Sequence, residues 1–277
     1  MLPDGRRIDC PIYGDPDGFP VLYCHGGLSA PVDIAFADEA ARERGVRIVA
    51  PARPGIGSSD RCRDRRVADW ASDVSAVVAA LGIDRFSVLG WSAGGPFALA
   101  VAAGLAPLVV RGATVGGMAP LWPPLSARQL GLRLDQVLFP LSRRSRRLAA
   151  LVVRASALAP AGVERGMLLR ALPPEDGAVV EKMTPAEVAD GMRDATRHGP
   201  GGVADDYAVL ADEWGFGLAD VGAPVTVFQG AADTLLPRSH AEALAAALPS
   251  GRLEVVEGSG HFLLHSHLAQ VFDALVG

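Results

Sequence analysis

The chain has 277 residues, of which 49% are apolar and 21% are charged, and this globular composition excludes wholesale disorder. Its formal net charge is -5, so it lacks the basic excess of a general nucleic-acid binder and we expect no nucleic-acid partner. Its three cysteines form an odd count without C-x-x-C spacing, which argues against a disulfide framework or a zinc site.

The apolar segments are too short to suggest export or membrane insertion. The polar stretch at residues 1–7 is not followed by the apolar run of a signal peptide. The longest apolar run, residues 97–110, has 14 residues, whereas a bilayer span needs about 20. We therefore expect no membrane span and a cytoplasmic protein, whose reducing environment agrees with the cysteine pattern.

The first hundred residues alternate between two patterns. Short apolar runs bounded by glycine or proline occur at 20–24, 46–50 and 86–89. Such runs are typical of strands buried in a parallel sheet. Apolar residues at helical spacing occupy 67–81 and 93–103. Strands that alternate with helices predict βαβ units, and hence an α/β fold with a mostly parallel sheet.

The pattern changes after a further strand at 109–115. Helical patterns replace strands over about a hundred residues, and strands return at 225–228 and 253–256. We therefore predict a core domain, residues 1–119 and 216–277, interrupted by a helical cap, residues 120–215. The expected helices are 125–138, 142–158, 161–171, 184–197 and 202–214 in the cap, and 239–248 and 262–276 after it.

The helical patterns of the cap carry apolar residues, such as Leu148, Leu151 and Val152 in one stretch and Val188 and Met192 in another. Apolar faces of this kind bury against a neighbouring element. Because the cap follows a strand, its ends should lie at the carboxyl edge of the sheet. We therefore expect the cap to roof a mostly apolar pocket there.

A nucleophile motif lies between a predicted strand and a predicted helix. Residues 90–94 read Gly-Trp-Ser-Ala-Gly, which is G-x-S-x-G with Ser92 at its centre. A sharp strand-to-helix turn strains the serine backbone and exposes its hydroxyl, and the flanking glycines allow close backbone approach. Ser92 is therefore the expected nucleophile.

A serine nucleophile needs a base that is oriented by an acid. His261 follows the last predicted strand within Gly-Ser-Gly-His-Phe, and Asp233 follows the strand before it. The chain order Ser…Asp…His is the order found with this motif. The loop after 109–115 reads Gly116-Gly117-Met118 and supplies no carboxylate. We therefore expect Ser92, His261 and Asp233 to act together.

An acyl-transfer site also needs backbone N–H groups for the oxyanion. The amide of Ala93 follows the nucleophile, and His25-Gly26-Gly27-Leu28 ends an earlier strand. We assign the second amide to Gly27, with Leu28 as the alternative. Candidate pocket residues are Leu28, Trp91, Met118, Trp122, Trp214 and Phe262, although hinge packing explains the cap-junction residues equally well.

Several segments together carry a family resemblance: His25-Gly26-Gly27, residues 53–59, residues 90–95, Asp233, Gly260-His261 and residues 214–218. In these the sequence resembles the α/β-hydrolase superfamily over nearly its whole length. The resemblance implies a sheet of about eight strands, a helical cap and a Ser-His-Asp triad. Epoxide hydrolases and haloalkane dehalogenases of that fold use a carboxylate nucleophile, which Ser92 excludes.

The branch within the superfamily stays open. We expect a cofactor-independent serine esterase that acts on a small-molecule acyl substrate, with no metal. His25-Gly26-Gly27 and a helical cap are also similar to prolyl iminopeptidases, although those carry Gly-Gly-Ser-Trp-Gly at the elbow. A prolyl iminopeptidase-type amidase and a non-catalytic ligand receptor are therefore the alternatives.

For three charged or histidine patterns we expect no functional role. The four arginines of residues 143–147 and the acidic pair Asp205-Asp206 are expected on solvated faces, although such acids could bind a substrate amine. His261 and His265 have metal-ligand spacing without a third ligand.

The amino-terminal edge of the sheet carries a separate expectation. The family's first strand would precede the turn at residues 3–5, so residues 6–13 would form an outer strand. Because exposed edges pair readily, we expect the region near Ile8 to be covered or to form a homo-oligomer.

Overall fold

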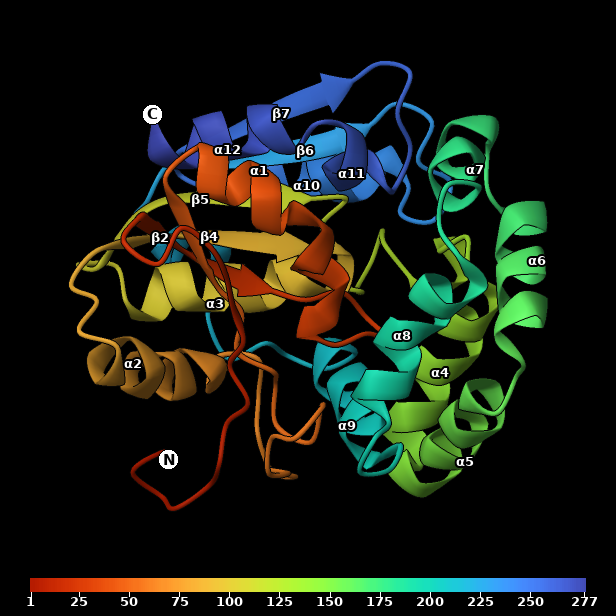
Figure 1. Ribbon diagram of the computed structural model, residues 1–277. Coiled ribbons are helices and arrows are strands. Elements are labelled where there is room, and N and C mark those ends of the chain that lie inside the picture. Colours follow the sequence, from red (N-terminus) through yellow and green to blue (C-terminus); the bar gives the residue numbers. More distant parts are fainter.

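A seven-stranded sheet forms the centre of the protein (Figure 1). The computed structural model describes residues 1–277. The strand order is β1-β3-β2-β4-β5-β6-β7, and only β1 is antiparallel to its neighbour. The strands are β1 Ile12–Gly14, β2 Phe19–Cys24, β3 Val46–Val49, β4 Phe86–Trp91, β5 Val109–Val115, β6 Val225–Gly230 and β7 Gly251–Val256. The expected mostly parallel sheet is thus confirmed, with seven strands.

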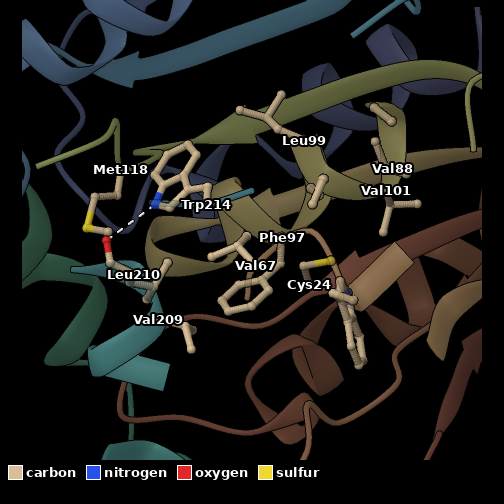
Figure 2. Packing of buried hydrophobic residues seen from close by; sticks show 14 of the residues in the cluster. Cys24, Val67, Val88, Phe97, Leu99, Val101, Met118, Val209, Leu210 and Trp214 are labelled. Carbon is tan, nitrogen blue, oxygen red and sulfur yellow. Dashed lines mark hydrogen bonds between the residues drawn. The ribbon is translucent and has the colours of Figure 1, made fainter. Parts of the chain in front are cut away.

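Helices cover both faces of the sheet and enclose two apolar clusters. On one face lie α2 (Trp70–Ala80), α3 (Gly95–Gly104) and α10 (Arg238–Ala247). On the other lie α1 (Asp38–Glu43), α11 (Leu263–Ser266) and α12 (Leu268–Val276). Figure 2 shows part of the larger cluster, which includes Val88 of β4 and Phe97 and Leu99 of α3. This three-layer packing holds the central strands rigidly.

The segment between β5 and β6, here called the cap segment (residues 120–215), is helical and contains no strand. Figure 1 shows its helices grouped beside the sheet. They are α4 Arg133–Arg144, α5 Arg146–Ala157, α6 Ala161–Ala171, α7 Pro174–Val180, α8 Pro185–Ala195 and α9 Gly201–Leu210. The short α7 is absent from the sequence prediction, and the helix expected from residue 125 begins only at Arg133.

The predicted apolar face of α5 is wrong at Leu148 and Leu151, whereas its third member, Val152, packs against the larger apolar cluster. Leu148 and Leu151 of α5 are 52% and 61% exposed, whereas Ala149 and Val153 are buried. α5 packs against α4 and α9. Its small residues line that contact and allow close approach, which turns the larger leucines outward.

The expected outer strand over residues 6–13 is also wrong in extent, because only Ile12–Gly14 is strand. The preceding residues bond to a loop instead: the amides of Ala52 and Asp60 donate to the carbonyls of Asp9 and Arg7 at 2.7 and 2.9 Å. Ile8 is half-buried against the larger apolar cluster. The edge near Ile8 is therefore covered from within the chain.

No helix of the protein combines the length and the apolar character needed to cross a bilayer.

Candidate active site

Ser92 lies at a sharp turn between β4 and α3. Its φ is 54°, a left-handed conformation that non-glycine residues rarely adopt. A Cβ added to Gly90 would lie 2.7 Å from the carbonyl oxygen of Gly94, and one added to Gly94 would overlap the carbonyl oxygen of Cys24. The two motif glycines therefore permit the backbone contacts that hold the serine in this strained position.

His261 and Asp233 form a buried pair. Nδ1 of His261 lies 2.9 Å from Oδ2 of Asp233. The other carboxylate oxygen of Asp233 accepts the amides of Leu235 and Leu236 at 2.8 and 2.9 Å, which fixes its orientation. The pair thus commits Nδ1 and leaves Nε2 for proton transfer.

Opposing effects act on the pKa of His261. Burial lowers the pKa, but the facing carboxylates of Asp233, then Asp176 and Asp135, raise it, and the net shift is upward. The facing carboxylates therefore favour the protonated form of the His261 imidazole.

The three residues of the candidate triad each follow a strand, and the carboxyl ends of these parallel strands lie at the same edge of the sheet. Ser92 follows β4, Asp233 follows β6 and His261 follows β7. Gly116 follows the intervening β5 with a φ of 50°, and a Cβ there would lie 2.9 Å from Nδ1 of His261 and 3.1 Å from Oδ2 of Asp233. The missing side chain at Gly116 is therefore needed for the histidine–aspartate contact.

The loop after β2 approaches the elbow at Gly27. A Cβ added to Gly27 would lie 3.2 Å from the Cβ of Ala93, and one added to Gly26 would lie 3.9 Å from the Cβ of Ser92. Leu28 also has a positive φ, of 54°. The two amides assigned to the oxyanion, Gly27 and Ala93, are thus on adjacent backbone segments.

Arg53 braces the loop that carries Gly27. It is 1% exposed, and its two terminal nitrogens donate to the carbonyls of His25 and Gly26 at 2.6 and 2.9 Å. Its Nε donates to Oδ2 of Asp206 at 2.8 Å. Since Asp206 belongs to α9, this contact connects the cap segment to the loop.

The expectation that Asp205 and Asp206 lie on a solvated face is wrong. Both are buried, and both are paired: Asp206 accepts from Arg53 and Arg65, and Asp205 accepts from Arg61 at 2.5 Å. Burial raises the pKa of Asp206, but the two arginines outweigh it and the net shift is downward. The charged partners explain why α9 can bury two consecutive acids.

A second acid, Asp33, holds the same loop. Its carboxylate accepts the amide of Gly26 at 3.1 Å and the hydroxyl of Tyr23 at 2.9 Å. Burial raises its pKa to about 6, against the opposing effect of these donors. The loop is therefore fixed by donors and acceptors on both its amide and its carbonyl sides.

The cap segment places two further acids at the site, and sequence reasoning missed both. Asp176 of α7 accepts the amides of His261 and Phe262, each at 2.8 Å. Asp135 of α4 accepts the hydroxyl of Tyr207 at 2.5 Å, and burial raises its pKa to about 6. Each acid lies in the first turn of its helix, where acids are common, so no local pattern distinguishes them.

The six proposed pocket residues occupy three different settings. Leu28 is half-buried against the larger apolar cluster, and the Met118 amide donates to the Ser92 carbonyl at 3.2 Å. Met118 and Trp214 are buried in the larger cluster, where the indole of Trp214 donates to the carbonyl of Leu210 at 3.3 Å (Figure 2). The remaining three are Trp122, which is 50% exposed beside Trp214, and Trp91 and Phe262, which pack in the cluster on the opposite face.

Trp91 contacts the backbone of His261. Its indole N–H donates to the carbonyl of His261 at 3.1 Å. His265 stacks on Phe36 with ring centres 3.7 Å apart. Trp91 therefore supports the histidine backbone.

The remaining arginines of the cap lie mostly on the surface, as expected. Arg143, Arg144 and Arg147 are exposed, and Arg146 is 3.6 Å from Asp205.

A cavity of about 250 Å³ lies at the opposite edge of the sheet, lined in part by Arg111, Thr226 and Arg252. These three lining residues lie near the amino ends of β5, β6 and β7, away from the carboxyl ends that Ser92 and His261 follow.

The comparison with known families agrees with this architecture. The family described as alpha/beta hydrolase fold matches residues 20–268. The chain belongs to the α/β-hydrolase fold family. Among solved members, the enol-lactonase from Burkholderia xenovorans has a TM-score of 0.73 at 19% identity, covering 98% of this chain and 97% of that one.

The sequence relatives of this chain are distant. An uncharacterized protein of Mycobacterium tuberculosis is 27% identical over 239 residues, which cover 82% of this chain but only 65% of that protein's length. A 2-hydroxymuconate semialdehyde hydrolase of Pseudomonas putida is 26% identical over 279 residues, covering 100% of this chain and 91% of the relative. A pimeloyl-[acyl-carrier protein] methyl ester esterase of Aromatoleum aromaticum is 29% identical, covering 80% and 83%.

Proposed function

We propose that the protein is a serine hydrolase that cleaves an ester or similar acyl compound through an acyl-enzyme. The observation that supports this proposal most is the strained Ser92 at the carboxyl edge of the sheet. The buried His261–Asp233 pair lies at the same edge, with 2.9 Å between Nδ1 and Oδ2. The names of two relatives, a hydrolase and a methyl ester esterase, support this chemistry.

In the first half-reaction, Oγ of Ser92 attacks the substrate carbonyl carbon while Nε2 of His261 takes the hydroxyl proton. Asp233 holds the tautomer and stabilises the imidazolium. The amides of Gly27 and Ala93 donate to the oxyanion. Collapse of the tetrahedral intermediate breaks the bond to the alcohol, which takes the proton from His261 and leaves Ser92 acylated.

Water completes the cycle by the same route. His261 takes a proton from water as the oxygen attacks the acyl carbon. Ser92 then leaves with that proton, and the carboxylic acid is released. No step needs a metal or a cofactor.

The cap segment is proposed as a lid over this site. Asp135 and Tyr207 come from α4 and α9 and bring a polar pair toward the histidine. Tyr207 also approaches the oxyanion loop, since a Cβ on Gly27 would lie 3.7 Å from its hydroxyl. A second negative charge beside Asp135 is unfavourable, so the substrate we propose is a neutral acyl ester of medium size.

The test combines a covalent probe with a substrate series. A fluorophosphonate should label the wild type, and Ser92→Ala should abolish labelling and reduce turnover by about a thousandfold or more while the fold persists. Among p-nitrophenyl esters, neutral medium-length acyl groups should be hydrolysed faster than an acyl chain that ends in a carboxylate.

Three outcomes would change the proposal. Preference for a prolyl amide would favour an iminopeptidase-type amidase. No labelling and no turnover would favour a ligand receptor on this fold. Full labelling of the Ser92→Ala protein would refute the nucleophile.

A further inference from the structure

An acid of the cap segment holds the backbone at the proposed catalytic histidine. The carboxylate of Asp176 accepts the amide of His261 with Oδ2 and the amide of Phe262 with Oδ1, each at 2.8 Å. Asp176 is 1% exposed. It lies 85 residues before His261 in the chain and belongs to α7, not to the core that carries the histidine.

Gly260 makes this approach possible. A Cβ on Gly260 would overlap the carboxylate of Asp176. The glycine before the histidine therefore leaves the space that a carboxylate from another element occupies. The same peptide segment is held from the opposite side, where the Trp91 indole donates to the His261 carbonyl at 3.1 Å.

A merely structural anchor for α7 would not require a buried charge. Burial raises the pKa of Asp176, and the two amides, with the charge of His261, only partly oppose that shift. Burying a carboxylate is unfavourable unless donors compensate for the lost water. Its placement against the reacting residue, rather than at a solvated part of the cap, favours a role at the site.

We propose that Asp176 is a positioning residue through which the cap segment aligns the catalytic histidine. By clamping two consecutive amides it orients the imidazole with Nδ1 on Asp233 and Nε2 toward Ser92. Because the clamp comes from α7, the base is fully competent only when this part of the cap is seated on the core. The inference rests on the proposed function for its kinetic consequences but not for its structural ones.

The charge of Asp176 has a second effect. Three acids face His261: Asp233 from the loop after β6, Asp176 from α7 and Asp135 from α4, and all raise its pKa. Removing the Asp176 charge should lower the pKa of His261. The free base would then be present at lower pH, so the acid limb of the kcat/KM profile should move to lower pH.

Kinetics of three variants test the positioning role. Asp176→Ala removes both acceptors, Asp176→Asn keeps the shape with one acceptor oxygen, and Glu175→Gln is a matched control on the same helix. We expect fluorophosphonate labelling and kcat to fall about 10- to 100-fold in Asp176→Ala, since a small misplacement of a catalytic group has effects of this size. In Asp176→Asn the labelling rate and kcat should fall less, and KM should change little. Both rates of Glu175→Gln should equal those of the wild type.

Hydrogen exchange tests the clamp without reference to activity. The peptide that contains His261 and Phe262 should exchange faster in Asp176→Ala than in Glu175→Gln, while β4 and β6 keep their protection. Unchanged exchange there would overturn the clamp, whether or not the protein labels.

The remaining outcomes separate the two proposals. If the wild type does not label but the exchange difference is present, the proposed function fails and the clamp stands. If the wild type labels while both Asp176 variants keep its labelling rate and its acid limb, the positioning role is wrong. A loss of labelling with an unshifted acid limb in the still-folded Asp176→Asn protein would also count against it.

Discussion

The sheet core and the cap segment are stabilised in different ways. All six residues of β4 are buried, whereas α6 in the cap has no buried residue. The cap is attached to the core in part by polar bridges: Asp206 to Arg53 and Arg65, Asp176 to the histidine loop, and the Gly131 amide to the Leu235 carbonyl at 2.9 Å. Apolar packing is non-directional, while hydrogen bonds and ion pairs depend on geometry. The core therefore supplies bulk stability, and the bridges define how the cap meets the site.

Among the variants considered, loss of the buried ion pairs of Asp206 with Arg53 and Arg65 should reduce the stability of the protein most. Asp206→Ala leaves Arg53 and Arg65 as buried charges without a carboxylate, and loss of one partner of such a pair destabilises by about 3–5 kcal/mol. Urea unfolding should show this loss, and labelling should slow because Arg53, which braces the Gly27 loop, loses its carboxylate partner on α9. Asp212→Ala, at an exposed acid just after α9, is the control and should unfold like the wild type. Equal stability of the two variants would mean that the bridge does not attach the cap.

A cavity in the core should be nearly as damaging. Leu99 of α3 is 1% exposed, and truncation of a buried leucine to alanine destabilises by about 2–5 kcal/mol. Leu99→Ala should therefore lower the midpoint of urea unfolding strongly. Its protection against hydrogen exchange should fall throughout the sheet, because the core unfolds as a unit. A loss confined to α3 would contradict this cooperative core.

The buried carboxylate of Asp135 should make the protein less stable at neutral pH than a neutral side chain at that position would. The pKa of Asp135 is about 6 in the folded protein against 3.8 as its ordinary value, so the folded state holds this proton more tightly than the unfolded state. Stability from this group is complete below pH 3.8 and is lost as pH rises through 6. Asp135→Asn should therefore stabilise the protein above pH 6 by about 2–3 kcal/mol.

Thermal unfolding at pH 4 and at pH 8 measures this difference. Asp33 has a raised pKa of the same sign and is present in both proteins, so it cancels in the comparison. An Asp135→Asn protein that gains equal stability at both pH values would show that titration of Asp135 is not the cause.

The smallest effect is expected on the outer face of the cap. Leu151 is 61% exposed, so Leu151→Ala removes almost no buried contact and should change stability by less than about 0.5 kcal/mol. This is the same substitution as Leu99→Ala in a different region, and urea unfolding compares the two directly. A large loss for Leu151→Ala would show that this leucine is covered in solution, for example by a second copy of the chain.

Local sequence patterns were sufficient for much of the core. Continuous apolar runs predicted β2, β3, β4, β5 and β6 close to their observed bounds, because a strand buried on both faces needs apolar residues throughout. Gly90 likewise reports a turn whose close contacts, with Gly94, Gly95 and Ala98, are local in the chain. The close contacts of Gly94, with Cys24 and His25, come instead from the loop after β2. Amphipathic spacing located most cap helices, but it misassigned Leu148 and Leu151, since periodicity shows that a face is apolar and not what will cover it.

By itself, the sequence determined the alternation of strands and helices, the elbow at Ser92 and the chain order of the three candidate catalytic residues, because each depends on a few neighbouring residues. Only the tertiary structure decided the partners of the buried charges. Arg53 and Asp206 are 153 residues apart, Asp176 and His261 are 85 apart, and Tyr207 and Asp135 are 72 apart. In the sequence an acid that will be buried looks like an acid that faces water. Its role is set by which donors the fold brings within about 3 Å of it, because a carboxylate can leave water only where such donors replace it.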